Sequence, residues 1–228
     1  MWIGRGLCCR WARAEAVAMD QVMMESPGST SAGAGAPQSE GRPLAEPAVT
    51  LMVSTDGSGG AFRSISLALA SRPASAEVLR IVVNAGTYDE VGLELRDNLQ
   101  IVAAPGCALA SDTAVVLTSR QDRPIVSSSA IGAVIKGLQI EHRGPFGSMA
   151  CIVIEGGDLR MEDCIVTGSV SVGVLICGES TPTIADCQLM RCCGDGIKVV
   201  DNAEPLVCGC DLHSNDGYKI STLCSASL

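Results

Sequence analysis

Three cysteines near the end of the chain recur at a constant spacing: Cys164, Cys187 and Cys210 are each 23 residues apart. Apolar residues keep the same spacing around them, in three further columns: Met161, Ile184 and Val207; Val166, Leu189 and Leu212; Val174, Ile197 and Ile220. A fixed period with apolar columns is typical of a solenoid, in which each repeat buries its apolar face only against its neighbours.

The length of the repeat selects the class of solenoid. A repeat of 23 residues is too short for a helical hairpin, which needs about 33 or more. It suits one turn of a parallel β-helix, with three short strands and three corners, stacked about 4.8 Å from the next turn. Leucine-rich repeats have a similar length, but their L-x-x-L-x-L pattern is absent here. The sequence therefore predicts an all-β solenoid with rungs of ~23 residues.

Composition and turn signals divide the chain into four parts. We expect a disordered head, because the first part is low in complexity and has no periodic apolar face. A strand at Val49–Val53 and an amphipathic helix near Ser64–Ala70 are then expected to cover the first rung. The predicted parts are a head at 1–48, a strand and capping helix at 49–78, the β-helix at 79–224 and a tail at 225–228.

Charge and hydropathy exclude several kinds of partner. The net charge is −9, which disfavours nucleic acid and anionic membranes because both require a basic surface. No run of about 18 apolar residues is present, so we predict no membrane span. Aromatic residues make up 3% of the chain, so aliphatic side chains and cysteines must fill the core.

The twelve cysteines suggest disulfides or a metal, but their periodic positions favour a reduced core. We predict that Cys164, Cys187 and Cys210 form an inward stack in an intracellular protein, cytoplasmic or nuclear. Cys192 and Cys193 are expected at a corner as exposed thiols. The spacings, C-x₄-C-C from Cys187 to Cys193 and C-x-C from Cys208 to Cys210, resemble the C-x₂₋₄-C pairs of zinc sites only weakly, so no metal and no cofactor are predicted.

Acidic residues are the main candidates for chemistry. Asp163 and Asp186 are one period apart, so they should stack on adjacent rungs. Such a pair could serve as general acid and base or as calcium ligands; alternatively, both are solvated corner residues. Asp195 superficially resembles a polygalacturonase motif, but the sequence supplies no convincing set of converging acids. His142 and His213 are expected in solvated loops, and no catalytic residue is predicted.

The repeat resembles the β-helix of the F-box-only adaptor family (F-box-only protein eleven and its relatives). The segments Thr181–Leu189 (TPTIADCQL) and Gly194–Val199 (GDGIKV) carry the likeness, which spans roughly residues 62–220. It implies a right-handed parallel β-helix and a role in recognising substrates for ubiquitin ligases. Residues 1–48 lack the Leu- and Pro-rich helical pattern of an F-box.

A narrower resemblance concerns the first rung. Val53–Phe62, followed by Ser64–Ala68, is similar to the opening of pectin methylesterases, which share the β-helix fold. Their catalytic aspartates lie in later motifs that have no match in this sequence. This likeness implies a shared capping segment rather than shared chemistry.

We therefore predict a non-enzymatic module that binds protein partners through the faces of its β-helix. The alternative is a carbohydrate-binding or carbohydrate-active β-helix, for which few exposed aromatics and no converging carboxylates are available. The last rung should leave unpaired strand edges, which predicts self-association through the C-terminal rung.

Overall fold

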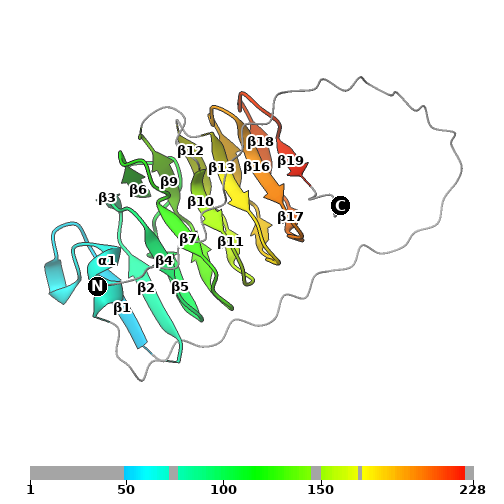
Figure 1. Ribbon diagram of the computed structural model, residues 1–228. Helices are drawn as coiled ribbons and strands as arrows, with labels where there is room; N and C mark the ends of the chain where they lie inside the picture. Colours follow the sequence, from blue (N-terminus) through cyan, green and yellow to red (C-terminus); the bar gives the residue numbers. More distant parts are fainter. Residues whose placement is uncertain (1–48, 72–76, 145–149, 169–170, 224–228) are drawn as a thin grey trace, which may run out of the picture. The chain divides into compact units, whose positions relative to one another are not determined.

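A computed structural model describes residues 49–71, 77–144, 150–168 and 171–223, and these form a parallel β-helix. Short strands stack along the axis of the solenoid from β1 (Val49–Val53) to β19 (Ile220–Leu223) (Figure 1). The predicted all-β solenoid is confirmed. The expected head at 1–48 and tail at 225–228 lie outside the described residues. In the part of the chain that the structure describes, no helix is long and apolar enough to span a membrane.

Three parallel sheets, which we call A, B and C, form the walls of the solenoid. From β2 onward, each rung contributes one strand to each sheet, in the order A, B, C along the chain, and β1 adds a seventh strand to sheet A. The strands of sheet A are β1, β2 (Leu79–Val83), β5 (Leu99–Ala103), β8 (Val134–Lys136), β11 (Arg160–Glu162), β14 (Thr183–Ala185) and β17 (Leu206–Cys208). Those of sheet B are β3 (Gly86–Asp89), β6 (Val115–Ser119), β9 (Gln139–His142), β12 (Ile165–Gly168), β15 (Gln188–Met190) and β18 (Asp211–His213). Those of sheet C are β4 (Leu93–Leu95), β7 (Val126–Ser128), β10 (Ala150–Ile154), β13 (Val172–Ile176), β16 (Asp195–Val200) and β19.

The apolar columns read from the sequence line the inside of the sheets. In the regular rungs the register pairs Met161 with Ile184, and Ile184 with Val207. The earlier rungs continue these columns although their lengths differ, because longer corners absorb the extra residues. Sheet B, for example, aligns Ile140 with Val166. One continuous core of aliphatic and cysteine side chains results.

One segment with the composition of a turn is a strand. The stretch from Asn84 to Tyr88 (NAGTY) follows an apolar run, yet Gly86–Asp89 pairs in parallel with residues 115–118 as strand β3. Its polar composition suggests a turn, whereas the backbone of β6 supplies a complete ladder of partners. Tyr88 is buried in the core from this strand, and its hydroxyl donates to the Asn84 carbonyl at 2.8 Å.

A short helix, α1 (Ile65–Ala70), packs against the first strands of sheet A (Figure 1). Ser64 caps it, since its hydroxyl accepts a hydrogen bond from the backbone N–H of Leu67 at 3.1 Å. The helix buries Ile65 and Ala68 completely. Buried Glu90 accepts a hydrogen bond from the backbone N–H of Ile65 at 2.5 Å and another from the Ser66 hydroxyl, so it ties the helix to the next rung.

Candidate functional site

Asp163 and Asp186 occupy the tight turn between sheets A and B. This turn has a left-handed residue in four successive rungs, with φ of 71° at Gly137, 49° at Asp163, 53° at Asp186 and 64° at Gly209. Aspartate tolerates this conformation better than most residues, and glycine adopts it without strain. The acidic pair predicted from the sequence therefore shares a column with two glycines, which explains why acids occur there without any catalytic requirement.

Each of the two carboxylates already has a structural neighbour. Asp163 lies 3.3 Å from the ammonium group of Lys136 in the preceding rung. The Asp186 side chain lies over Gly209, where a Cβ atom would collide with Asp186 Oδ1. Gly209 thus leaves the space that the Asp186 carboxylate fills, and neither acid is aimed at a shared reaction centre.

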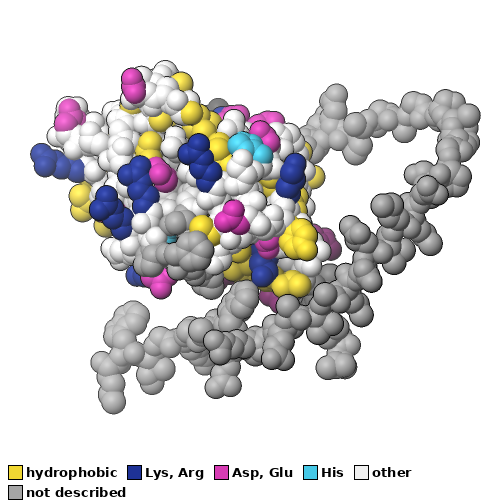
Figure 2. All heavy atoms as spheres, turned by 90° about the horizontal axis from the view of Figure 1, so that it is seen from above, with side chains coloured by type: hydrophobic (Ala, Val, Ile, Leu, Met, Phe, Trp, Pro, Cys, Tyr) yellow, Lys and Arg dark blue, Asp and Glu magenta, His cyan; other side chains and the backbone are white. Residues whose placement is uncertain are grey.

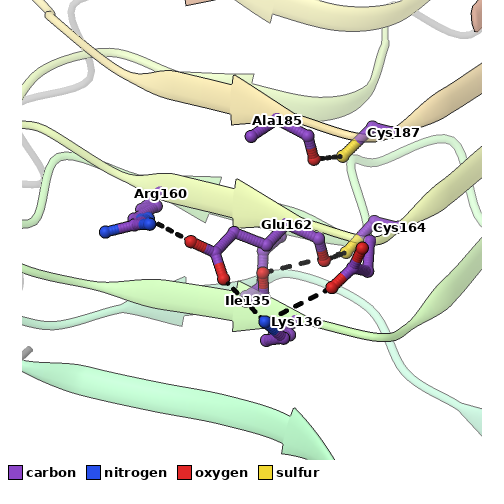
Figure 3. A network of polar contacts seen from close by, with 8 residues as sticks. Ile135, Lys136, Arg160, Glu162, Cys164, Ala185 and Cys187 are labelled. Atoms are coloured by element: carbon purple, nitrogen blue, oxygen red, sulfur yellow. Dashed lines mark hydrogen bonds and ion pairs between the residues drawn. The ribbon is translucent and has the colours of Figure 1, made fainter. Parts of the chain in front are cut away.

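Lys136, Arg160, Glu162 and Asp163 form a polar network on the outer face of sheet A (Figure 3). Glu162 accepts from Lys136 Nζ at 2.9 Å and is also ion-paired with Arg160. The hydrogen bond to Glu162 is the main cause that raises the pKa of Lys136, which keeps the ammonium group charged. Two cations and two anions balance here, so the network links β8 to β11 and leaves no free acid or base.

The cysteine column lies at the corner that follows the left-handed turn. Cys164 and Cys187 are buried, and Cys210 is half-buried. Their thiols donate to backbone carbonyls two residues earlier, at 3.2 Å from Cys164 to Glu162 and 3.2 Å from Cys187 to Ala185 (Figure 3). The neighbouring Cys164 thiol, together with burial, raises the pKa of Cys187. A neutral buried thiol is a poor nucleophile, so Cys187 acts as a core residue.

Two expectations about exposed side chains were wrong. Cys192 was expected as an exposed corner thiol, but it is buried, and burial raises its pKa to about 11. His142 was expected in a solvated loop, but it is buried at the end of β9. Its Nδ1 accepts from the backbone N–H of Gly144 at 3.1 Å, so Nε2 is the nitrogen that donates, to the Arg123 carbonyl at 3.0 Å.

The remaining candidates also have structural partners. Asp195, which resembled a polygalacturonase motif, accepts from the backbone N–H of Tyr218 at 2.8 Å and from the Ser221 hydroxyl at 2.5 Å. It therefore joins β16 to the following rung. His213 is exposed and lies 3.7 Å from Asp211. No cluster of three or more His, Cys, Asp or Glu suited to a metal ion occurs within the described ranges.

A feature that the sequence reasoning missed is a series of arginines along one edge of the solenoid. Arg120, Arg123, Arg143 and Arg191 are exposed, and all belong to corners that connect sheet B to sheet C. We call these four residues the arginine edge. Arg143 pairs with Glu141 at 2.7 Å. The other three make no ion pair with any residue that the structure describes.

Figure 2 shows Lys and Arg side chains spread along the length of one face, with acidic side chains between them. The arginine edge was hidden in the sequence because the rungs that carry it differ in length. Only the observed register, such as Ile140 beside Val166, places these corners one above another. An extended ligand that lies along the axis would meet a new corner about every 4.8 Å.

The outer face of sheet C is apolar in the middle rungs. Val153 and Leu175 are paired neighbours in β10 and β13 and belong to a small cluster separate from the main core. Their strand neighbours Ile152 and Ile154 point into the core instead. These two rungs therefore carry aliphatic side chains on the outer side of sheet C, and Val153 and Leu175 are buried there.

Comparisons with known proteins agree with this architecture. The family model described as "Right handed beta helix region" matches residues 95–228. No significant match was found among curated protein sequences. Similar solved structures include a pectin methylesterase mutant in complex with hexasaccharide IV, at 18% identity and a TM-score of 0.55, covering 75% of this chain and 60% of that one.

Two other pectin methylesterase structures are similar. One, in complex with hexasaccharide VII, has 14% identity and a TM-score of 0.52, covering 74% of this chain and 66% of that one. PemA from Erwinia chrysanthemi has 17% identity and a TM-score of 0.47, covering 66% of this chain and 54% of that one. The chain thus spans less than two thirds of each of these enzymes, and the likeness concerns the fold. The family match over more than half of its length shows that the chain belongs to the right-handed β-helix family.

Proposed function

We propose that this β-helix binds an extended anionic carbohydrate along the arginine edge and does not cleave it. The observation that carries the proposal is the position of four exposed arginines on the same corner of several rungs in a chain whose net charge is −9. A guanidinium group offers five donors in a planar fork that matches carboxylate oxygens. A polymer that carries one carboxylate per sugar could therefore contact the corners that follow β6, β9 and β15.

The structural neighbours support a carbohydrate ligand more than the adaptor role. Two of them are crystal structures of complexes with hexasaccharides. Because the identities are below 20%, this support concerns the kind of surface that a β-helix offers and not individual residues.

The contacts of the acidic residues that the structure describes support binding without turnover. Asp163 is paired with Lys136, and Asp195 holds two groups of the following rung. Glycoside hydrolysis needs two carboxyl groups on either side of the scissile bond, at a separation of roughly 5–10 Å. Asp163 and Asp195 are instead engaged in contacts between neighbouring rungs.

Calorimetric titration with hexagalacturonate at neutral pH tests the proposal, with maltohexaose as the uncharged ligand of equal length. We expect binding of the anionic oligomer only, and an affinity that falls as salt rises. Each exposed charge contributes about 0.2–1 kcal/mol, so the triple variant Arg120→Gln, Arg123→Gln, Arg191→Gln should bind roughly tenfold more weakly.

The matched control is Arg96→Gln, which removes an exposed arginine from a corner between sheets C and A. This variant should bind hexagalacturonate like the unmodified protein. Equal binding of both oligosaccharides, or an equal loss of affinity in the triple variant and the control, would refute the proposal.

A protein partner is the second candidate. Among the described aromatic residues, Tyr88 is buried, Phe62 packs against the core, and Tyr218 is exposed. Carbohydrate sites commonly use several exposed aromatic rings, so their scarcity here favours a protein ligand. The outer face of sheet A offers a rigid polar surface, on which Arg80 Nε donates to Gln100 Oε1 at 2.9 Å beside the network of Lys136.

This second candidate corresponds to the resemblance to F-box adaptors, and affinity capture from native lysate tests it. Recovery of ubiquitin-ligase components, reduced by the double variant Arg80→Ala, Lys136→Ala and retained by Arg96→Gln, would favour it over the carbohydrate. If the double variant recovers the same proteins in the same amounts as the unmodified protein, there is no reason to assign a protein partner to that face.

A further inference from the structure

The two ends of the solenoid differ in how far the residues of their apolar columns are buried. At the last described rung, Ile220 and Leu223 of β19 are 44% and 56% exposed. One rung earlier, Ile197 pairs with Ile220 and is completely buried, whereas Val200, which pairs with Leu223, is half-buried and packs outside the main core. Strand β19 therefore carries one core-column side chain, Ile220, that the described part of the chain leaves partly exposed, while Leu212 of β18 in the same rung is buried.

The same rung has strand edges without a partner among the described residues. Strands β17, β18 and β19 are terminal in their sheets, since each pairs only with the strand of the preceding rung. Three parallel edges, one on each wall, thus face the same direction along the axis. Exposed edges of this kind pair readily with other strands, because their N–H and C=O groups need partners.

The arrangement of these edges restricts the kind of partner surface that can pair with all three. A single added strand would pair with one wall and leave the other two open. A surface with three strand edges arranged in the same way is a rung of a β-helix. The opposite end of a second copy does not offer one, because α1 lies there against β1 and β2, held by buried Glu90.

We propose that two copies of this chain associate through their C-terminal rungs, related by a two-fold axis. The contact is self-complementary, since each copy presents the same three edges and the same exposed Ile220 and Leu223. It closes at two copies, because the only end left outside the contact is the one that α1 covers. The assembly is therefore a discrete dimer and not a filament.

The charge of the rung predicts how the dimer responds to salt. The described part of this rung carries Glu204, Asp211 and Asp216 against a single lysine, Lys219. Two such ends repel each other at neutral pH, so added salt should tighten the dimer by screening this repulsion. The response is opposite to that expected for carbohydrate binding at the arginine edge, which keeps the two proposals separable.

Sedimentation equilibrium of the full chain over a range of micromolar concentrations tests the dimer. We expect a mass of about twice 23.4 kDa for the unmodified protein. Ile220→Asp should raise the dissociation constant of the dimer by more than about tenfold, because it places a new charge in each copy of an apolar contact. Ile131→Asp is the matched control, since Ile131 is 57% exposed and lies in the loop between β7 and β8.

Hydrogen exchange identifies the surface independently of mass. In the dimer, the amides of β17, β18 and β19 should exchange more slowly than in Ile220→Asp, and those of α1 should be unchanged. Thermal unfolding monitored by circular dichroism checks that both variants fold. A monomeric mass at every concentration, or a dimer that Ile220→Asp leaves as tight as Ile131→Asp does, overturns the proposal.

Discussion

The first and last rungs of this solenoid contain the same kinds of strand but differ in what covers them. At the N-terminal end, α1 covers the first strands, and Val53, Ile65 and Ala68 are completely buried. At the C-terminal end, Ile220 occupies a core column and is nearly half exposed. The comparison shows that, for residues of one core column, burial also depends on whether a neighbouring element covers the rung.

The two ends are also expected to contribute to different properties, the covered end to the stability of the monomer and the open end to association with a partner. A covered end contributes to the free energy of folding of the monomer, because its apolar groups are already removed from water. An open end contributes little to the monomer but has apolar surface and backbone groups to offer a partner. We therefore expect equivalent substitutions at the two ends to have different effects.

The largest effect is expected from truncating one column in two successive rungs. Ile197→Ala should lower the free energy of unfolding by about 2–4 kcal/mol, because it leaves a cavity in a closed core. Ile220→Ala, the next residue in the same column, should cost only about 1 kcal/mol in the monomer, because water already reaches this side chain. Urea denaturation at concentrations where the protein is monomeric measures both values. Equal costs would mean that the last rung is covered.

A smaller effect is expected from releasing the helix that covers the first rung. Glu90→Ala removes the acceptor for the backbone N–H of Ile65 and for the Ser66 hydroxyl, and should cost about 1–3 kcal/mol. Glu204→Ala at the opposite end changes an exposed residue and should cost less than about 0.5 kcal/mol. Urea denaturation of both variants gives the comparison, and hydrogen exchange of α1 shows whether the helix has loosened. A loss at Glu90 no greater than that at Glu204 would argue against this anchoring role.

The sequence was sufficient to predict the fold because the period and the core use the same residues. The columns of Met161, Ile184 and Val207 define the repeat, and their register is the one observed. The prediction was least successful where neighbouring rungs decide the structure. Gly86–Asp89 looks like a turn until it pairs with β6, and His142 looks solvated until the Arg123 carbonyl and the Gly144 N–H approach its ring.

The candidate site was harder to predict than the fold for the same reason. A surface edge consists of residues that share a corner, and corners are where this chain varies in length. Arg123 and Arg191 belong to the same edge although no fixed period relates them. Asp163 and Asp186 do share the period, but their left-handed turns and nearby partners give the shared position a structural cause.

The cysteine column allows the two ends to be compared by chemical labelling. Cys187 is buried and Cys210, the next residue in the column, is half-buried because fewer atoms cover the last rung. We expect a thiol reagent to modify Cys210 about tenfold faster than Cys187 under native conditions, with exposed Cys208 as the accessible reference. Mass spectrometry of the digested protein gives each rate. Labelling of Cys187 as fast as that of Cys208 would show that the column is open to solvent.

The smallest effect is expected from the pH dependence of the turn that leads to α1. Hydrogen bonds from the Ser54 hydroxyl and the backbone N–H of Ser58 lower the pKa of Asp56 from 3.8 to about 2. Because the folded state lowers this pKa, the ionised carboxylate stabilises the protein above pH 3.8, and that contribution is lost as the pH falls towards 2. Asp56→Asn should therefore lower Tm slightly at pH 6, and the difference from the unmodified protein should shrink through this window. Ser54→Ala removes the main donor and should reduce the same pH dependence. A difference in Tm that stays constant from pH 6 to pH 2 would show that the charge of Asp56 does not stabilise the turn.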